Sequence, residues 1–346
     1  MGPAADFFDS FEAKGVRLFF KEECGFDALV AARPDMTIVS VGDQDEGIEY
    51  YPTLKAEGLD YVIVNQLTKE VRFWPIRQEK SEAVTNAYVG ARKVYFTCRN
   101  NHAVMERRLG RIIQNAEIHY NPYHIDGAAA PPWPSEERGL QVAIPSKLLF
   151  IHKGQDLLAE VASSTRWRTR PVEFNFYGEG PDGPKLKALA AERGIANFSF
   201  HGRVADIGVI WRDNHALLMP SRMEGMPIML VSAMLSARVS ILTDVGGHAE
   251  SVIDGACGFI AREPSVDSLA EAMERAWAAR SQWREMGEAA RERILSILPE
   301  DPVEDFVERA LALVRTNAYA TAPRATGQRH ATTTMAADAG AAGGRG

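Results

Sequence analysis

The sequence predicts an α/β protein with two domains, each built on a parallel sheet. Short runs rich in β-branched and aromatic residues alternate with helix-length segments through most of the 346 residues, a pattern typical of βα units. A segment rich in proline, glycine and alanine, 127–139, interrupts this alternation and is predicted to be an interdomain linker. The chain is also long enough for two separate hydrophobic cores.

The composition argues against several classes of protein. Hydrophobic residues make up 46% and charged residues 25% of the chain, as in ordinary soluble proteins. The net charge of −7 argues against a general nucleic-acid binder. No apolar run approaches the roughly 18 residues of a membrane span, and the N-terminus lacks the plan of a signal peptide. Cys24, Cys98 and Cys257 show neither a disulfide framework nor metal-ligand spacing, which favours the cytoplasm.

Residues 1–126 are predicted to form the first domain. Its strand candidates are 16–20, 37–41, 61–64 and 94–97, and its helix candidates are 48–57 and 79–91. Two strand ends carry polar clusters. Asp43 and Asp45 follow one strand, and Asn65 and Gln66 follow the next. The carboxylates are either part of a solvated turn or contacts to an acceptor substrate, and the sequence leaves both interpretations open.

The second domain is predicted over residues 140–302. Lys147 and Lys153 stand six positions apart ahead of a helix, which is consistent with a solvated helix end or with a phosphate site. The strand 172–177 then stops at Gly178 and Gly180, in a turn that lets the backbone approach a ligand closely.

The stretch 216–250 carries the strongest functional signal. A buried strand ends at Pro220, a loop with Glu224 follows, and a helix begins at Gly225-Met226-Pro227-Ile228. Because parallel sheets bind ligands at the carboxyl ends of their strands, we expect the chemistry here. The first N–H groups of the helix suit a phosphate or sugar oxygens. A carboxylate at this position is best explained by sugar hydroxyls or by a neighbouring positive charge.

The C-terminal part is predicted to contain two helices and a tail. Ser265 can cap a helix that carries Leu269, Met273 and Trp277 on one face. A final helix, 303–315, is expected to return to the first domain. Residues 316–346 are rich in alanine, glycine and threonine without apolar periodicity, which predicts a disordered tail.

The stretch 216–250 resembles the retaining glycosyltransferases of family 4. Members of this family carry a proline-serine pair, then glutamate-glycine, then glutamate-alanine-methionine, followed by a threonine, a glycine pair and a glutamate. The matching residues here are Pro220, Ser221, Glu224, Gly225, Pro227, Ala233, Met234, Thr243, Gly246, Gly247 and Glu250. One position differs from the family pattern. Ser232 stands where the family has its second glutamate, which is expected to hold the donor ribose.

The resemblance implies a GT-B fold, in which two Rossmann-like domains face a cleft. Lys147 takes the place of a family arginine that grips the donor diphosphate together with Lys153. Backbone groups around Arg203 and Val204 are expected to meet the nucleobase, and Glu224 is expected to orient the donor sugar. The first domain lacks the glycine-rich loop of the family, so its first βα units are expected to be missing. Asn65 or Gln66 stands where the family often has a histidine.

The expected function is therefore transfer of a sugar, with retention of configuration, from a UDP or GDP donor to a hydroxyl of a glycan, a lipid or a small molecule. No cofactor and no metal are expected, because this family uses no bound metal. The resemblance also implies that the leaving diphosphate itself assists deprotonation of the acceptor, so no nucleophile from the protein is expected. Peripheral contact with a membrane is left open. The alternative is a catalytically impaired nucleotide-sugar-binding or partner protein, which Ser232 favours. A sugar epimerase of the same fold fits less well, because the order of residues 224–232 resembles the transferases.

Overall fold

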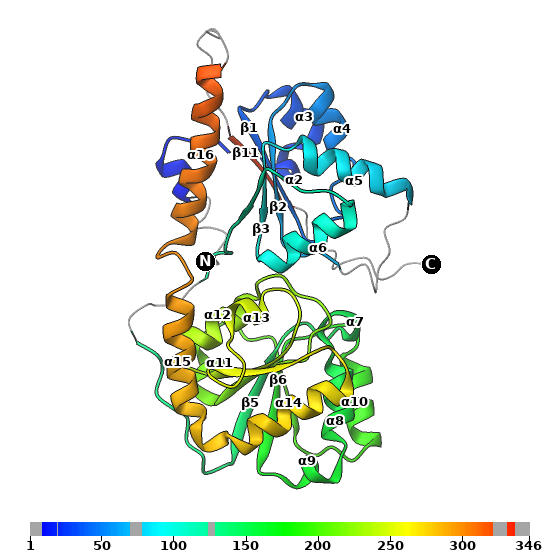
Figure 1. Ribbon diagram of the computed structural model, residues 1–346, viewed down its shortest axis with the longest axis vertical. Coiled ribbons are helices and arrows are strands. Elements are labelled where there is room, and N and C mark those ends of the chain that lie inside the picture. Colours follow the sequence, from blue (N-terminus) through cyan, green and yellow to red (C-terminus); the bar gives the residue numbers. More distant parts are fainter. Residues whose placement is uncertain (1–8, 19, 70–77, 124–128, 321–330, 336–346) are drawn as a thin grey trace. The chain divides into compact units, whose positions relative to one another are not determined.

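The structure, a computed structural model, describes residues 9–18, 20–69, 78–123, 129–320 and 331–335. The chain forms two compact units (Figure 1). Unit 1 comprises Met1–Pro122 and Asp301–Gly346, and unit 2 comprises Tyr123–Glu300. Each unit contains its own parallel sheet. The predicted fold class, α/β with two parallel sheets, is confirmed.

The sheet of unit 1 has the strand order β11-β1-β2-β3-β4, and every neighbouring pair is parallel. Its strands are β1 (Met36–Val41), β2 (Tyr61–Asn65), β3 (Lys93–Phe96), β4 (Ala116–Ile118) and β11 (Ala331–Met335). The first domain therefore contributes four strands of its own. The candidate strand at 16–20 is wrong, because the described residues there form only isolated bridges. The strand β11 lies inside the stretch predicted to be disordered, where its three threonines give a local β propensity.

Helices cover both faces of the unit 1 sheet (Figure 1). They are α2 (Lys21–Cys24), α3 (Phe26–Ala31), α4 (Tyr51–Ala56), α5 (Gln78–Gly90), α6 (Arg99–Leu109) and α16 (Pro302–Ala320). Successive strand residues face opposite sides. Val39 and Ile63 pack in the cluster that contains residues of α4, α5 and α6. Ile38 and Val62 pack instead with Phe306 of α16. The final helix thus belongs to the core of unit 1.

The sheet of unit 2 has the strand order β10-β9-β8-β5-β6-β7, again with all pairs parallel. Its strands are β5 (Leu140–Pro145), β6 (Val172–Tyr177), β7 (Phe198–Gly202), β8 (Ala216–Met219), β9 (Val239–Thr243) and β10 (Gly258–Ala261). The chain runs outward from β5 to β7 and then returns to β8 on the other side of β5. This is the doubly wound order, with its reversal between β5 and β8.

The helices of unit 2 lie between these strands in the chain, except for the last two, which follow β10. They are α7 (Phe150–Lys153), α8 (Gln155–Ala162), α9 (Thr165–Thr169), α10 (Gly183–Glu192), α11 (Ile207–Asp213), α12 (Ile228–Leu235), α13 (His248–Ser251), α14 (Val266–Ala278) and α15 (Trp283–Leu295), with a short 3-10 turn at Arg280–Gln282. Helix α8 contacts α10 and α14, whereas α12 contacts α15. The Ser265 hydroxyl caps α14 by accepting a bond from the Ser268 N–H.

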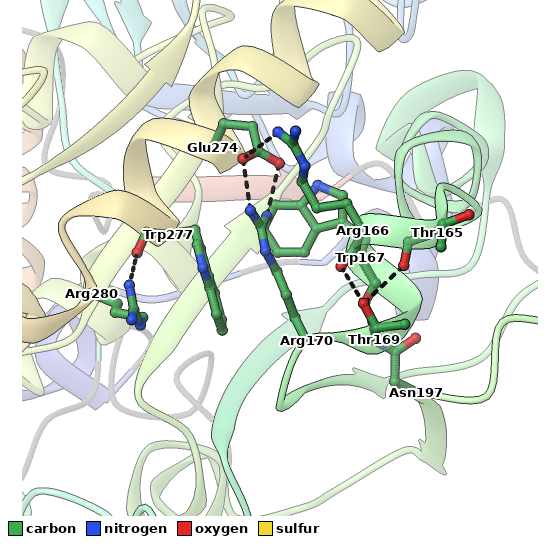
Figure 2. A network of polar contacts seen from close by, with 9 residues as sticks. All are labelled: Thr165, Arg166, Trp167, Thr169, Arg170, Asn197, Glu274, Trp277 and Arg280. Atoms are coloured by element: carbon green, nitrogen blue, oxygen red, sulfur yellow. Dashed lines mark hydrogen bonds and ion pairs between the residues drawn. The ribbon is translucent and has the colours of Figure 1, made fainter.

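An arginine held between two tryptophans joins α9 to α14. The guanidinium of Arg170 lies 4.3 Å from the ring centroid of Trp167 and 4.7 Å from that of Trp277. Figure 2 shows the Glu274 carboxylate at the open end of this stack, where it accepts two bonds of 2.8 Å from Arg170. Arg280 covers Trp277 from the next turn of the chain. Cation–π contacts and a bidentate ion pair together hold α9, which directly precedes β6 in the chain, against α14.

A buried arginine anchors the predicted linker. The described part of the linker, 129–139, falls within unit 2. The Arg238 side chain donates to the carbonyl oxygens of Pro132 at 2.8 Å, Asn214 at 2.9 Å and Trp211 at 2.6 Å. Burial lowers the pKa of its guanidinium to about 10. Backbone carbonyls therefore satisfy this charge and tie the linker to unit 2.

Among the described residues, no helix has the length and apolar character needed to cross a membrane.

Candidate functional site

The strand order of unit 2 defines where a ligand can bind. The chain direction reverses between β5 and β8, so the loops that follow these two strands lie side by side at one edge of the sheet. Open α/β sheets bind their ligands in the crevice at such a switch point. The loop after β5 contains Lys147, and the loop after β8 contains Glu224. The two segments singled out in the sequence therefore meet at this edge.

Glu224 and Lys153 form an ion pair at the switch point. The Lys153 Nζ lies 2.6 Å from the Glu224 Oε1, and the exposed fractions of the two side chains are 25% and 8%. The Ser221 hydroxyl also donates to the Glu224 Oε1, at 2.8 Å. A neighbouring positive charge was one of the two explanations for Glu224 drawn from the sequence, and in this structure Lys153 supplies it. The residues predicted to hold phosphate and sugar contact each other directly.

The loops that carry this pair are held together by their backbones. Gly154 has a φ of +64°, and a Cβ at this position would lie 1.9 Å from the Pro220 carbonyl oxygen. Only glycine allows this approach. Arg222 donates two bonds of 2.7 Å to the Asp156 carboxylate and one of 2.6 Å to the Phe150 carbonyl. The segment that presents Lys153 therefore has a fixed position against the Glu224 loop.

A third loop, after β9, supports Glu224 from the other side. The Thr243 hydroxyl donates to the Ser221 carbonyl at 2.6 Å, and the Gly247 N–H donates to the Gly225 carbonyl at 2.8 Å. A Cβ on Gly246 would lie 2.3 Å from the Glu224 carbonyl oxygen. Gly246, the first glycine of the pair recognised in the sequence, is therefore needed for close packing of two loops. This packing fixes the backbone on both sides of Glu224.

The predicted phosphate-binding helix start opens next to Glu224. Helix α12 begins at Ile228, and Pro227, which precedes it, supplies no side-chain cap. Gly225, Met226 and Ile228 each carry a backbone N–H, whereas Pro227 has none. Met226 is buried and Ile228 is exposed. Lys147 is exposed one strand away, after β5. These positions are compatible with an anion at the end of α12.

Gly178 and Gly180 serve contacts between loops. A Cβ on Gly178 would lie 2.2 Å from the Ser146 carbonyl oxygen, and one on Gly180 would lie 2.3 Å from the Leu148 carbonyl oxygen. The turn after β6 therefore lies directly on the loop after β5. Arg203, after β7, is exposed, and Val204 beside it is half-buried. The predicted nucleotide-binding residues thus lie at the ends of β6 and β7, next to the switch point.

Ser232 lies inside the protein. Its exposed fraction is 5%, and its hydroxyl accepts a 2.6 Å bond from the Trp211 indole N–H. Trp211 belongs to α11 and is itself buried. Sequence analysis did not identify this partner. The hydroxyl at the position expected to hold the ribose is therefore already bonded within the protein.

The carboxylates of the predicted acceptor side lie after β1, within unit 1. The Asp43 carboxylate pairs with the Lys69 Nζ at 2.6 Å and accepts a bond from the Asp45 N–H. The side chain of Gln44, which lies between the two aspartates, is buried and bonds Asp45 and the Lys69 N–H. The loop is therefore ordered by its own polar groups and by one lysine.

The two amides after β2 differ in accessibility. Asn65 is fully buried and donates a 2.5 Å bond to the Tyr88 hydroxyl, whose pKa is raised by burial. The Gln66 side chain is half-buried and accepts a bond from Asn121 at 2.7 Å. Of the two, Gln66 is the residue that retains contact with solvent.

His248 is a polar residue of the site that sequence analysis missed. It begins α13, directly after the glycine pair, and it is fully buried. Its Nδ1 lies 2.7 Å from the Thr243 carbonyl oxygen. Burial lowers the pKa of its imidazole, and the nearby Glu224 carboxylate partly opposes this effect. The only available signal was a histidine directly after two glycines. Among the described residues, no group of three or more His, Cys, Asp or Glu side chains could hold a metal ion.

The sequence of this region matches known proteins. The sequence model of the family described as Glycosyl transferases group 1 matches residues 136–293. The alpha-D-kanosaminyltransferase of Streptomyces kanamyceticus is 27% identical over 133 residues, which cover 37% of this chain and 34% of that protein. A glycogen synthase of Pseudomonas syringae pv. syringae is 28% identical over 143 residues, covering 39% and 28% of the two chains. This chain thus spans well under half the length of the curated relatives it matches.

Solved structures show the same fold at lower sequence identity. HepE of Anabaena, solved in complex with UDP-glucose, superposes with a TM-score of 0.67 at 16% identity, over 83% of this chain and 81% of that one. Sucrose-phosphate synthase of Thermosynechococcus elongatus superposes with a TM-score of 0.68 at 17% identity, over 86% and 77% of the two chains. Residues 136–293 thus match the glycosyl transferases group 1 family, and the doubly wound sheet of unit 2 together with the solved structures shows a GT-B-like fold.

Proposed function

We propose that this chain is a retaining glycosyltransferase that moves a sugar from a nucleotide diphosphate donor to an acceptor hydroxyl. The observation that carries the proposal is the 2.6 Å ion pair between Lys153 and Glu224 at the switch point of unit 2. A cation suited to phosphate and a carboxylate suited to sugar hydroxyls stand there side by side. A nucleotide sugar carries both chemical groups in adjacent positions.

In this proposal, binding of the donor breaks the ion pair, and Lys153 and Glu224 each form a new contact with the donor. The diphosphate binds Lys153 and Lys147, together with the N–H groups of Gly225, Met226 and Ile228 and the positive end of α12. The Glu224 carboxylate is released from Lys153 and accepts bonds from hydroxyls of the donor sugar. The nucleotide lies over the turns at Gly178 and Gly180 and near Arg203, Val204 and Ser232. Because the Anabaena neighbour was solved with UDP-glucose, a UDP donor is the first to test.

The chemical step needs no nucleophile from the protein. The bond from the sugar anomeric carbon to the diphosphate oxygen breaks, and the acceptor oxygen forms its bond on the same face. The acceptor proton passes to the departing diphosphate oxygen. Lys153 and the helix start offset the charge that develops on that oxygen, so the diphosphate leaves as a stabilised anion. No metal is required in this scheme.

The acceptor is proposed to be a glycan, a lipid or a small molecule that contacts polar groups of unit 1. Asp43, Asp45 and Gln66 supply polar groups at strand ends of that unit. Asn65 contributes through the order of its loop, because its own side chain is buried. A lipid acceptor would bring the protein into peripheral contact with a membrane. A cytoplasmic location is proposed with it, supported by the free thiols of Cys24 and Cys257.

A second candidate function is binding of a nucleotide sugar without transfer. Two observations favour it. The Ser232 hydroxyl is committed to Trp211, and Asn65 is committed to Tyr88. Both side chains are buried, so neither presents its polar group to a ligand at the surface. A protein with this site would bind the donor but would not catalyse transfer of the sugar.

Release of nucleoside diphosphate from donor sugars distinguishes the two functions. The protein is incubated with UDP-glucose and with GDP-mannose, and free UDP or GDP is measured over time, with and without added acceptors. A transferase releases diphosphate faster than the Glu224→Gln variant does. Binding of a donor with no release above that variant would support the second function. Failure to bind any donor would contradict both.

A further inference from the structure

His248 lies directly behind the ion pair of the proposed donor site. It follows Gly246 and Gly247, which contact the backbone of Glu224 and Gly225. Its side chain is fully buried, and the charges of Glu224 and Lys153 both act on the pKa of its imidazole. A histidine in this position can therefore affect whatever binds to Glu224. The scheme proposed above gives it no role.

The hydrogen bond at Nδ1 fixes the tautomer of His248. Nδ1 lies 2.7 Å from the Thr243 carbonyl oxygen, and a carbonyl oxygen can only accept. Nδ1 must therefore carry the proton. Because burial lowers the pKa of the imidazole, the ring is neutral near pH 7. It follows that Nε2 presents a lone pair and acts as an acceptor.

This lone pair has no partner among the residues that the structure describes. The Nε2 atom is buried and forms no hydrogen bond there. The Lys153 ammonium, whose charge acts on His248, is already bonded to Glu224. A buried acceptor without a partner costs roughly 1–3 kcal/mol. Such a group is retained most readily when a ligand supplies the missing donor.

We propose that Nε2 of His248 accepts a hydrogen bond from a hydroxyl of the donor sugar. This inference rests on the proposed function and adds a specificity-determining residue to the same site. The Glu224 carboxylate and the His248 lone pair are both acceptors, and neither attracts a phosphate. Together they complement a polyol, whose O–H groups donate. The pair therefore selects the sugar part of the donor and not its diphosphate.

Two substitutions of His248 distinguish the role of Nδ1 from the role of Nε2. In His248→Asn, the side-chain NH₂ can replace Nδ1 and keep the bond to Thr243, but no acceptor remains at the Nε2 position. In His248→Gln, the longer amide places an acceptor near Nε2 and gives up the bond to Thr243. Thermal unfolding of both variants shows that they are folded before binding is measured. His248→Gln is expected to be the less stable of the two.

Binding of UDP and of UDP-glucose is then compared by calorimetry. The expected result is that His248→Asn binds UDP like the wild type and binds UDP-glucose roughly tenfold more weakly, the loss of one hydrogen bond. His248→Gln should recover most of the affinity for UDP-glucose. Equal affinity of wild type and His248→Asn for UDP-glucose would overturn the inference. So would an equal loss for UDP and UDP-glucose, which is the result of a structural role or of a bond to a buried water.

Nitrogen NMR of the imidazole provides a readout independent of the variants. In the free protein, the Nε2 signal of His248 should have the shift of an unprotonated ring nitrogen, and UDP-glucose should move it whereas UDP should not. An unmoved signal on saturation with UDP-glucose overturns the inference and leaves the proposed function intact. If the wild type binds neither UDP-glucose nor GDP-mannose, the proposed function fails, and this inference fails with it.

Discussion

Replacing Glu224 by glutamine should change the affinities for UDP and for UDP-glucose in opposite directions. In the free protein the Glu224 carboxylate holds Lys153 at 2.6 Å, so a diphosphate must compete with it for the ammonium group. Glutamine keeps the shape and can still accept the bond from Ser221. It does not hold the ammonium by charge. Lys153 then becomes available to the diphosphate, while the sugar loses a charged acceptor.

The size of the effect follows from the geometry of the pair. A charge-assisted hydrogen bond contributes about 1.5–3 kcal/mol. Glu224 is nearly buried and Lys153 is only a quarter exposed, so solvent screens the pair incompletely. We therefore expect Glu224→Gln to raise the affinity for UDP by up to roughly tenfold, and to lower the affinity for UDP-glucose below its wild-type value by up to a similar factor. The reference variant, Lys153→Ala, should lower the affinity for both ligands by roughly tenfold to a hundredfold.

Calorimetry at fixed ionic strength measures these changes, with thermal unfolding as the test of folding. The opposite signs are the essential part of this prediction. If Glu224→Gln weakens UDP binding as much as Lys153→Ala does, then Glu224 positions the lysine and does not compete with the diphosphate. If UDP-glucose and UDP change in parallel in Glu224→Gln, the carboxylate does not contact the sugar. Either result would refute the exchange of partners on which the proposed function depends.

Three further predictions concern stability. Gly154→Ala should lower the free energy of unfolding by about 2 kcal/mol or more, because the new Cβ would meet the Pro220 carbonyl oxygen, and urea titration measures the loss. Ser232→Ala should cost about 1–3 kcal/mol in the same assay by leaving the buried Trp211 N–H without its acceptor, so an unchanged midpoint would argue against that bond. Burial lowers the pKa of His119 to about 4, so its stabilising contribution is complete above the unfolded pKa near 6.5 and is lost as the pH falls toward 4. His119→Phe should remove about 3 kcal/mol of this acid dependence. Urea titration at pH 7 and at pH 4.5 measures it, and an equal drop of the urea midpoint between the two pH values in variant and wild type would contradict the prediction.

Much of the fold could be predicted from the sequence because local patterns determine it. The strands β1, β2 and β3 and the β8–α12–β9 unit have apolar runs and breaking residues that require no tertiary information. The candidate strand at 16–20 was wrong because it, too, was inferred from local composition alone. Its apolar residues have the composition of a strand, but composition does not show whether a neighbouring strand is available for pairing.

The site was predictable in its residues and not in its contacts. The sequence placed Lys153 and Glu224 in one site, but it could not show that they bond each other, since 71 positions separate them along the chain. It assigned Gly178 and Gly180 to close approach of a ligand, whereas both lie against the backbone of the loop after β5. The buried partners of Ser232 and Asn65 were equally invisible. A hydroxyl or an amide in a sequence gives no indication of whether a tryptophan or a tyrosine has already bonded it.

A crystal structure of the protein with UDP-glucose is the most direct test of the central claim. The account predicts that the diphosphate lies within hydrogen-bond distance of the Lys153 ammonium and of the N–H groups at the start of α12. The glucose hydroxyls should lie against Glu224, and the 2.6 Å pair of the free protein should be broken. A nucleotide bound elsewhere in unit 2, or one bound while Lys153 and Glu224 remain paired, would contradict the account.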